Sequence, residues 1–350
     1  MGIKRPSALL LGAMLICAMC MTALPKTALA APWSGPCLDF TNPITSATGD
    51  GYSWESSSST LTLSGLEYTS TESTAIKLPA NSTIQLTPGT TNTVTSAGGS
   101  NCYGILCDVT NGNLTITGGG SLTVTSGAAT QYGSRGIHVM GDLTVSGGSK
   151  VIGVGGNAPE YSHGIFSRSL TVADTSEVEG RSGGTASTQI NIGVNSSTIN
   201  VSGNAKLTGV AGAADIKSCG ISFNICAITG GTLLASSGAA PDSKALSGQP
   251  DLAGYPSYLW RTAATDPFTQ NSVQPYVWDV SHTYVEIRPV TGGGGGATGD
   301  AGTDADVPRT GDGAQPWLWA TLVLLAGAGL AASAVLRRSQ HKFKYTRQRH

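Results

Sequence analysis

The sequence predicts an all-β protein, a right-handed parallel β-helix (a β-solenoid) of about six coils, and three observations support this fold class. A small residue followed by a branched aliphatic residue recurs along the chain at intervals of 27 to 32 residues. A short alternating strand follows most of these pairs, and another apolar residue stands eight positions after the first residue of that strand. Glycine, which tolerates the bends between such strands, provides 48 of the 350 residues.

The repeated residues predict three columns that face the interior. The first column comprises Ile76, Ile105, Ile137, Ile165, Val194 and Ile221. The second strands begin at Leu114, Leu143, Leu170, Ile199 and Cys226, and the third strands are marked by Leu122, Val151, Val178, Leu207 and Leu234. One unit cannot bury an apolar face alone, so the units must stack. A β-sandwich is the alternative, because its short strands also alternate with regularly spaced turns.

The corner between the second and third strands carries residues that accept a positive φ. Four corners contain glycine, at Gly118-Gly119, Gly147-Gly148, Gly203-Asn204 and Gly230-Gly231. The fifth corner has Ala173-Asp174, and aspartate is one of the few other residues that adopt this conformation. We therefore expect a bend with positive φ at each of these corners.

Residues 1–30 are expected to be a secretory signal peptide. Lys4 and Arg5 precede an apolar stretch over residues 8–24, and Ala28-Leu29-Ala30 supplies the small-x-small pattern for cleavage between Ala30 and Ala31. An uncleaved membrane anchor is the alternative.

The mature chain then divides into a cap over 31–52, the β-helix repeats over 53–248, an aromatic-rich, β-rich closing element over 249–290, and a glycine-rich flexible spacer over 291–306.

Residues 307–350 combine three features. Val307, Pro308, Thr310 and Gly311 precede an apolar run over 317–336, long enough to cross a bilayer, and a basic tail follows. This order resembles the cell-wall sorting signal of Gram-positive surface proteins, although Val307 stands where leucine is usual. The resemblance implies that a sortase cleaves the Thr310–Gly311 bond and transfers the chain to peptidoglycan. A plain single-pass anchor is the alternative.

The body of the chain resembles the pectate-lyase-like, carbohydrate-binding β-helical domains of wall-anchored proteins. The resemblance extends over residues 50–290 and rests on the alternation of short strands with glycine-containing turns. An example is Gly112-Asn113-Leu114-Thr115-Ile116-Thr117-Gly118-Gly119. It implies a parallel β-helix and a glycan as partner. A fold of this kind is reused for many tasks, so the ligand must be argued from the site.

Charge excludes some partners. Residues 31–310 hold 11 Lys and Arg against 20 Asp and Glu, a net charge of −9. This charge disfavours nucleic acids and anionic membranes, so we expect membrane contact only through the segment 317–336 of the precursor.

No residue pattern predicts catalysis, a cofactor or a metal site. The residue that follows each aliphatic residue of the first column is expected to face outward. These residues are Leu106, His138, Phe166, Asn195 and Ser222, and none of them is acidic. General acid–base catalysis needs two titrating groups close together, and His138 and His163 lack a nucleophilic partner at an equivalent position. Asn113 and Asp142 align, but two oxygen ligands are too few for calcium. We therefore predict no enzyme activity; a polysaccharide lyase or hydrolase is the remaining catalytic alternative.

The mature chain has five cysteines, Cys37, Cys102, Cys107, Cys219 and Cys226, and an odd number cannot pair completely. Cys226 replaces an aliphatic residue of an interior column, which favours a buried thiol. Cys102 and Cys219 lie four coils apart, about 19 Å, too far for a disulfide.

One corner of the solenoid is the candidate glycan-binding face. Tyr132 and Tyr161 are 29 residues apart, and Gln131, Glu160 and Gln189 follow the same interval, so we expect them to stack beside His138 and Phe166. Sugars dock on aromatic rings while amides and carboxylates bind the hydroxyls. The alternative is a ladder of turns that only packs the corner. The sequence thus predicts a wall-anchored, non-catalytic surface protein that binds a glycan or a host surface, or else a stalk or adhesin for a protein partner.

Overall fold

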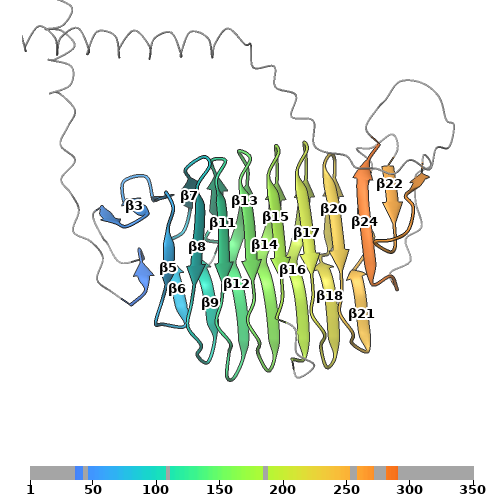
Figure 1. Ribbon diagram of the computed structural model, residues 1–350, viewed down its shortest axis with the longest axis horizontal. Helices are drawn as coiled ribbons and strands as arrows, with labels where there is room; N and C mark the ends of the chain where they lie inside the picture. The colour runs from blue at the N-terminus through green and yellow to red at the C-terminus, as the bar shows by residue number, and fades with distance from the viewer. Residues whose placement is uncertain are drawn as a thin grey trace, which may run out of the picture. The chain divides into compact units, whose positions relative to one another are not determined.

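The computed structural model describes residues 36–41, 46–107, 111–183, 188–252, 258–271 and 281–290. Every one of the 24 elements assigned within these residues is a β-strand. The strands wind into a parallel β-solenoid of about six coils, stacked side by side along the long axis (Figure 1). The predicted solenoid is therefore confirmed, and the β-sandwich alternative is wrong, because each strand of a coil pairs in parallel with its equivalent in the next coil.

Each coil contributes to three faces. The first face contains β1 (Leu38–Asp39), β6 (Thr74–Lys77), β9 (Cys102–Cys107), the first halves of β12 (Gly133–Val145), β14 (Tyr161–Val172) and β16 (Ile190–Val201), then β18 (Lys217–Ser222) and β21 (Asp242–Leu246). The second face contains β4 (Thr60–Leu63), β7 (Ser82–Leu86), β10 (Leu114–Thr117), the second halves of the same three strands, and β19 (Ile225–Ile228). In the middle coils the first two predicted strands are thus one continuous strand.

The third face is a separate sheet. Its parallel strands are β5 (Glu67–Thr69), β8 (Thr91–Thr95), β11 (Ser121–Thr125), β13 (Lys150–Val154), β15 (Glu177–Arg181), β17 (Lys206–Val210) and β20 (Thr232–Ser236). Antiparallel strands continue this sheet after β20, in the order β24 (Tyr284–Pro289), β22 (Tyr258–Arg261) and β23 (Thr269–Asn271). Val285 and Ile287 of β24 join the buried core, so the last coil does not expose its apolar interior on this face.

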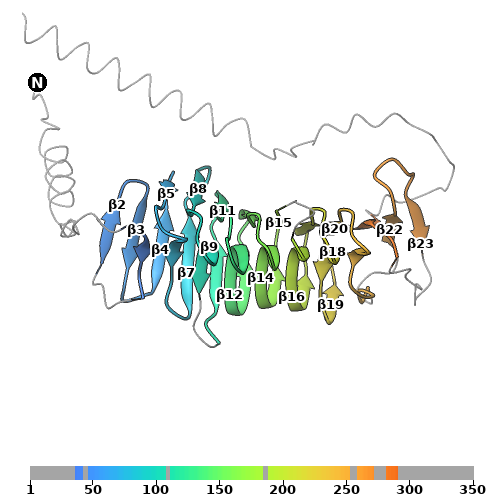
Figure 2. The ribbon, with the colours of Figure 1, turned by 90° about the horizontal axis from the view of Figure 1, so that it is seen from below.

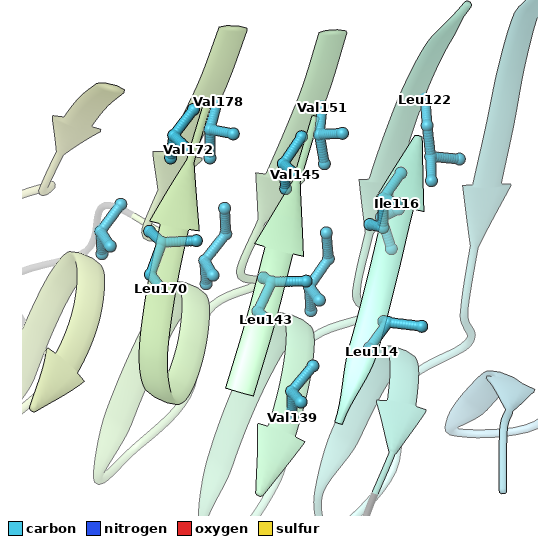
Figure 3. Close-up of a cluster of buried hydrophobic side chains, with 14 of the residues drawn as sticks. Leu114, Ile116, Leu122, Val139, Leu143, Val145, Val151, Leu170, Val172 and Val178 are labelled. Atoms are coloured by element: carbon cyan, nitrogen blue, oxygen red, sulfur yellow. The ribbon is translucent and has the colours of Figure 1, made fainter. Parts of the chain in front are cut away.

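The interior is filled by columns of aliphatic side chains. Figure 3 shows leucine and valine side chains of successive coils pointing inward from the second and third faces in repeated rows. The first-face column runs in register through Leu38, Ile76, Ile105, Ile137, Ile165, Val194, Ile221 and Leu246. The predicted column is confirmed and extends by one residue at each end.

One predicted member of the third column is wrong. Leu207 pairs with Leu233, which is fully buried, whereas Leu234 pairs with Thr208 and is half-exposed. The corner at Gly230-Gly231 is one residue shorter than the earlier corners, so the interval of eight becomes seven. The side-chain period of a strand is two, and a shift of one residue therefore exchanges the inward and outward positions.

Two columns of glycine bring the first and third faces together. A Cβ on Gly164 of β14 would overlap the backbone nitrogen of Arg181 in β15 and stand 2.6 Å from the carbonyl oxygen of Gly193. The facing Gly180 of β15 would likewise carry its Cβ into the backbone of β16. The glycine of each repeated pair from Gly104 to Gly220 is therefore needed for the close approach of two sheets.

The corners adopt the predicted conformation. Gly119, Gly147, Gly203 and Gly231 have φ between 67° and 83°, and Asp174 has φ of 63°. The carboxylate of Asp174 also accepts a hydrogen bond from the backbone N–H of Gly147 at 2.9 Å. Aspartate therefore replaces glycine at this corner with a side chain that binds the neighbouring coil.

The first coil is closed by antiparallel strands. β2 (Ala47–Gly49) pairs with β3 (Tyr52–Glu55), and β3 pairs with β4, which lies parallel to β7. Phe40 stacks on Trp54 with ring centroids 4.8 Å apart and covers the end of the core. These strands cover an edge that would otherwise pair with another chain.

Several predicted features lie outside the described residues: the signal peptide with its cleavage at Ala30 and Ala31, the spacer, the sorting motif at Val307, Pro308, Thr310 and Gly311, and the apolar segment 317–336. Within the part of the chain that the structure describes, no helix has the length and apolarity to span a bilayer.

Candidate functional site

The outer side of the first face carries a cluster of aromatic and basic side chains. Figure 2 shows β12, β14, β16 and β18 side by side in successive coils. Because the glycine and the aliphatic residue of each repeated pair both face the interior, the outward positions are two residues before the aliphatic and one residue after it. These positions and the start of β14 provide the outer aromatic cluster: Tyr103, Arg135, His138, Tyr161, His163 and Phe166.

Arg135 stands at the centre of this cluster. Its guanidinium carbon lies 4.3 Å from the ring centroid of Tyr161, 4.8 Å from that of Phe166 and 5.9 Å from that of Tyr103. At these distances the rings attract the cation electrostatically. The same guanidinium donates from Nε to Nδ1 of His163 and from one terminal nitrogen to Nδ1 of His138, both at 3.4 Å.

The two histidines are neutral parts of the cluster. Burial and the nearby charge of Arg135 lower the pKa of His138 to about 3, and burial, followed by Arg135, lowers the pKa of His163 well below its usual value. Since Nδ1 of His138 accepts from Arg135, its proton is on Nε2, which lies 3.1 Å from Sδ of Met140. Two neutral imidazoles and three aromatic rings thus surround one positive charge.

The ring of Tyr161 depends on a glycine in the preceding coil. Tyr161 pairs with Gly133, and a Cβ at Gly133 would overlap the tyrosine ring. Tyr161 also stacks on His163, with centroids 5.3 Å apart and planes at 21°. The ring lies over the backbone of the neighbouring coil and remains half-exposed, as does Phe166.

The predicted register of the corner residues is wrong. Tyr161 aligns with Gly133 and Ile190, whereas the backbone N–H of Glu160 donates to the carbonyl of Tyr132 at 3.0 Å. The step between these coils is 28 residues, not 29, so Tyr132 and Tyr161 do not stack. Tyr132 lies in the row of Glu160 and Gln189, one residue away from the row of Tyr161, and Gln131 falls in the row before it.

The outward row predicted from the sequence is confirmed. His138 pairs with Leu106 and Phe166, and Phe166 pairs with Asn195, which pairs with Ser222. The rings of His138 and Phe166 are in contact, edge to face, at 5.0 Å. Of the predicted binding residues, the structure therefore brings Tyr161, His138 and Phe166 into one cluster and leaves Tyr132, Gln131, Glu160 and Gln189 along the adjoining corner.

The cluster contains three residues that the binding prediction missed: Tyr103, Arg135 and His163. They occupy one outward row, two residues before the first-column aliphatic of three successive coils. The spacing of the repeat places these three residues in one row, but it does not show which side of the sheet the row faces.

A hollow lies on the third face. It has a volume of about 130 Å³ and is lined by Lys150, Glu177, Glu179 and Lys206, among others. Lys150 and Glu177 form an ion pair at 3.6 Å. Positive and negative charges alternate here, in contrast to the outer aromatic cluster.

The cysteines are buried. Cys226 occupies the predicted interior column, in register with Ile199, and burial raises the pKa of its thiol to about 12. Cys219 also has its pKa raised, to about 11, chiefly by burial. Among the described residues, no group of three or more His, Cys, Asp or Glu is placed to hold a metal ion.

Acidification is expected to destabilise the protein through His138. The unfolded chain binds a proton at the ordinary histidine pKa of about 6.5, whereas the folded chain binds it only near pH 3, so stability is lost as pH falls below 6.5. Between pH 7 and pH 5 this loss is about 2 kcal/mol for His138. Thermal unfolding of the wild type and His138→Gln at both pH values measures it; equal dependence on pH in the two proteins would contradict a neutral, buried His138.

Comparison of the chain with protein-family models, with curated proteins and with solved structures gives no match. The site must therefore be interpreted from its own geometry.

Proposed function

We propose that the protein is a non-catalytic carbohydrate-binding protein and that the outer aromatic cluster is its binding surface. The observation that carries this proposal is the grouping of Tyr161 and Phe166, two half-buried rings on the outer side of one strand, around the donor groups of Arg135. Sugar rings pack their apolar C–H faces on aromatic rings, and their hydroxyls accept hydrogen bonds from such donors.

The chemistry of the cluster supports binding rather than catalysis. Low pKa values keep His138 and His163 neutral at physiological pH, so neither is a ready proton donor. Both Nδ1 atoms accept from Arg135. The rigid strands on which the side chains lie form a prepared surface, which reduces the entropy lost when a ligand binds.

A glycan array tests the proposal. We expect the purified full-length protein to bind at least one class of glycan and Tyr161→Ala to lose that binding, because the alanine removes the stacking ring. Tyr161→Phe, which keeps the ring, should retain most of the binding. Binding by Tyr161→Ala at the wild-type level, or no binding by the wild type to any glycan, would contradict the proposal.

The matched control is Tyr132→Ala. Tyr132 is an exposed tyrosine on the adjoining corner and has no ring contact in the described residues. We expect this variant to bind as the wild type does. A melting temperature measured for each variant separates loss of the site from loss of the fold: Tyr161→Ala should unfold within a few degrees of the wild type, and a collapse of stability would support the packing ladder instead.

We propose further that the protein is displayed on the wall of a Gram-positive cell, with a right-handed solenoid held away from its attachment point by the spacer 291–306. The signal peptide, the motif at residues 307–311, the apolar segment and the basic tail support this location. The coil length of 27 to 32 residues supports the right-handed form. Sortase and peptidoglycan would be the partners of this attachment.

Thr310→Ala is expected to prevent covalent attachment, because the acyl group that a sortase transfers is that of Thr310. Cell fractionation should find the wild type linked to the wall and the variant in the membrane or the medium. Full extraction of the wild type by detergent would show instead that the chain is a plain membrane anchor.

A further inference from the structure

We infer that the outer aromatic cluster takes an acidic oligosaccharide, one that carries a carboxylate or a sulfate on its sugar rings. This inference rests on the proposed function and specifies its ligand. It follows from an imbalance of charge on the first face.

Arg135 has hydrogen-bonding capacity that the protein does not use. A guanidinium has five N–H donors, and two of them are directed to His163 and His138. Both acceptors are neutral, so they satisfy donors without compensating the charge. Within the described residues, no carboxylate lies within 4 Å of Arg135, although its side chain is half-buried.

Of the ten Lys and Arg side chains in the described residues, four have no carboxylate within 4 Å; Lys206 and Arg288 are exposed, whereas Arg135 and Lys217 are half-buried. Six other basic side chains each pair with a carboxylate: Lys77, Lys150, Arg168, Arg181, Lys244 and Arg261. A buried cation without a partner is costly, and groups of this kind are usually paired. The rings around Arg135 compensate part of that cost, and an anionic ligand would supply the remainder.

A second half-buried cation without a carboxylate partner among the described residues lies on the same face. Lys217 of β18 stands in the row of Tyr161 and Ile190, and its charge contributes to the lowered pKa of His163. The next residue of that row is Asp242, whose carboxylate pairs with Lys244 at 2.8 Å. Arg135 and Lys217 are three coils apart, about 14 Å at the ordinary strand spacing. The half-exposed rings of Tyr161 and Phe166 belong to a coil between them. This layout suits a short chain of sugars with separated negative groups rather than a single sugar.

A guanidinium binds a carboxylate or a sulfate through parallel hydrogen bonds that are stronger than those to a neutral hydroxyl. The net charge of −9 over residues 31–310 repels anions at long range, so binding must depend on contacts at the cluster. We therefore expect selectivity to be local and to follow Arg135.

The experiment measures the affinity of the full-length protein for three probes. They are a hyaluronan oligosaccharide, which carries carboxylates, the same oligosaccharide with its carboxyl groups reduced to alcohols, and the reduced oligosaccharide bearing sulfate esters as its only acidic groups. We expect at least one acidic probe to bind about tenfold more tightly than the reduced probe. The relative affinity of the two acidic probes shows whether the natural group is a carboxylate or a sulfate.

Two variants test which cations cause the tighter binding of the acidic probes. Arg135→Met keeps an unbranched side chain against the rings and should remove the preference for acid, and Lys217→Gln, on another coil, should reduce it. Stronger binding of the reduced probe, or an unchanged preference in both variants, would overturn the inference. Binding only to neutral glycans of the array, dependent on Tyr161, would overturn the acidic ligand but leave the proposed function intact. Failure to bind any glycan would instead defeat the proposed function and this inference together.

Discussion

Val194→Asp is expected to unfold the solenoid. Val194 is fully buried in the first interior column, between Ile165 and Ile221 of the neighbouring coils. A carboxyl group there would lose its hydration without a polar partner, at a cost of several kcal/mol. The total stability of a domain is typically about 5–15 kcal/mol, so one such substitution removes much of it. Circular dichroism and urea denaturation measure the loss.

The control places the same residue one position further along β16. Asn195 lies on the outward row, in register with Phe166 and Ser222, and is half-exposed. Asn195→Asp keeps its shape and its access to water, so we expect stability within about 0.5 kcal/mol of the wild type. If Asn195→Asp were the more damaging change, the inward and outward assignments of the first face would be wrong by one residue.

Gly164→Ala is expected to lower stability by about 2–3 kcal/mol, although it adds a single methyl group. The added Cβ would overlap backbone atoms of β15, and a backbone in a paired sheet cannot move aside as a flexible side chain can. The first and third faces would have to separate along several coils. Urea denaturation of the variant measures this cost.

Gly248→Ala is the matched control, because its Cβ would meet only the ring of Phe223, at 3.5 Å. That is an ordinary contact distance, and the variant should unfold within about 0.5 kcal/mol of the wild type. Similar losses in both glycine variants would mean that the close approach of the two sheets is not the cause, because Gly→Ala by itself restricts the unfolded chain and favours folding.

The repeat was sufficient to predict the interior of the solenoid. Ile105, Ile137, Ile165 and Val194 are buried and aligned as expected because each coil must place a like residue on the one below. The positive φ of Asp174 could also be predicted, since its equivalents in other coils are glycine. The interior column depends on stacking and the positive φ depends on local conformation. The residue types at each position of the repeat indicate both.

Register at the corners could not be predicted from a fixed interval. The coil length varies by a residue where a corner is shorter, which moved Leu233 into the place expected for Leu234. The separation of Tyr132 from Tyr161, in contrast, could have been predicted, because Ile137 and Ile165 of the first column are 28 residues apart, not 29. Corner length depends on turn hydrogen bonds, such as that from Ser176 N–H to the Ala173 carbonyl at 3.2 Å, which a fixed interval does not encode.

The centre of the cluster was missed for a different reason. Simple alternation from the inward Ile137 would place Gly136 outside and Arg135 inside, which is the wrong side for both. Only the approach of Gly136 to the backbone of β13 shows that the glycine and Ile137 both face the core and that Arg135 faces out. The cation at the centre of the rings is therefore a consequence of tertiary packing.

A crystal structure of the protein with the tightest ligand from the glycan array shows where the ligand binds. We expect a sugar packed against the rings of Tyr161 and Phe166, with an acidic group hydrogen-bonded to the guanidinium of Arg135. A ligand bound instead in the hollow lined by Lys150, Glu177 and Lys206, or at the corner of Tyr132 without contact to Tyr161, would contradict this expectation.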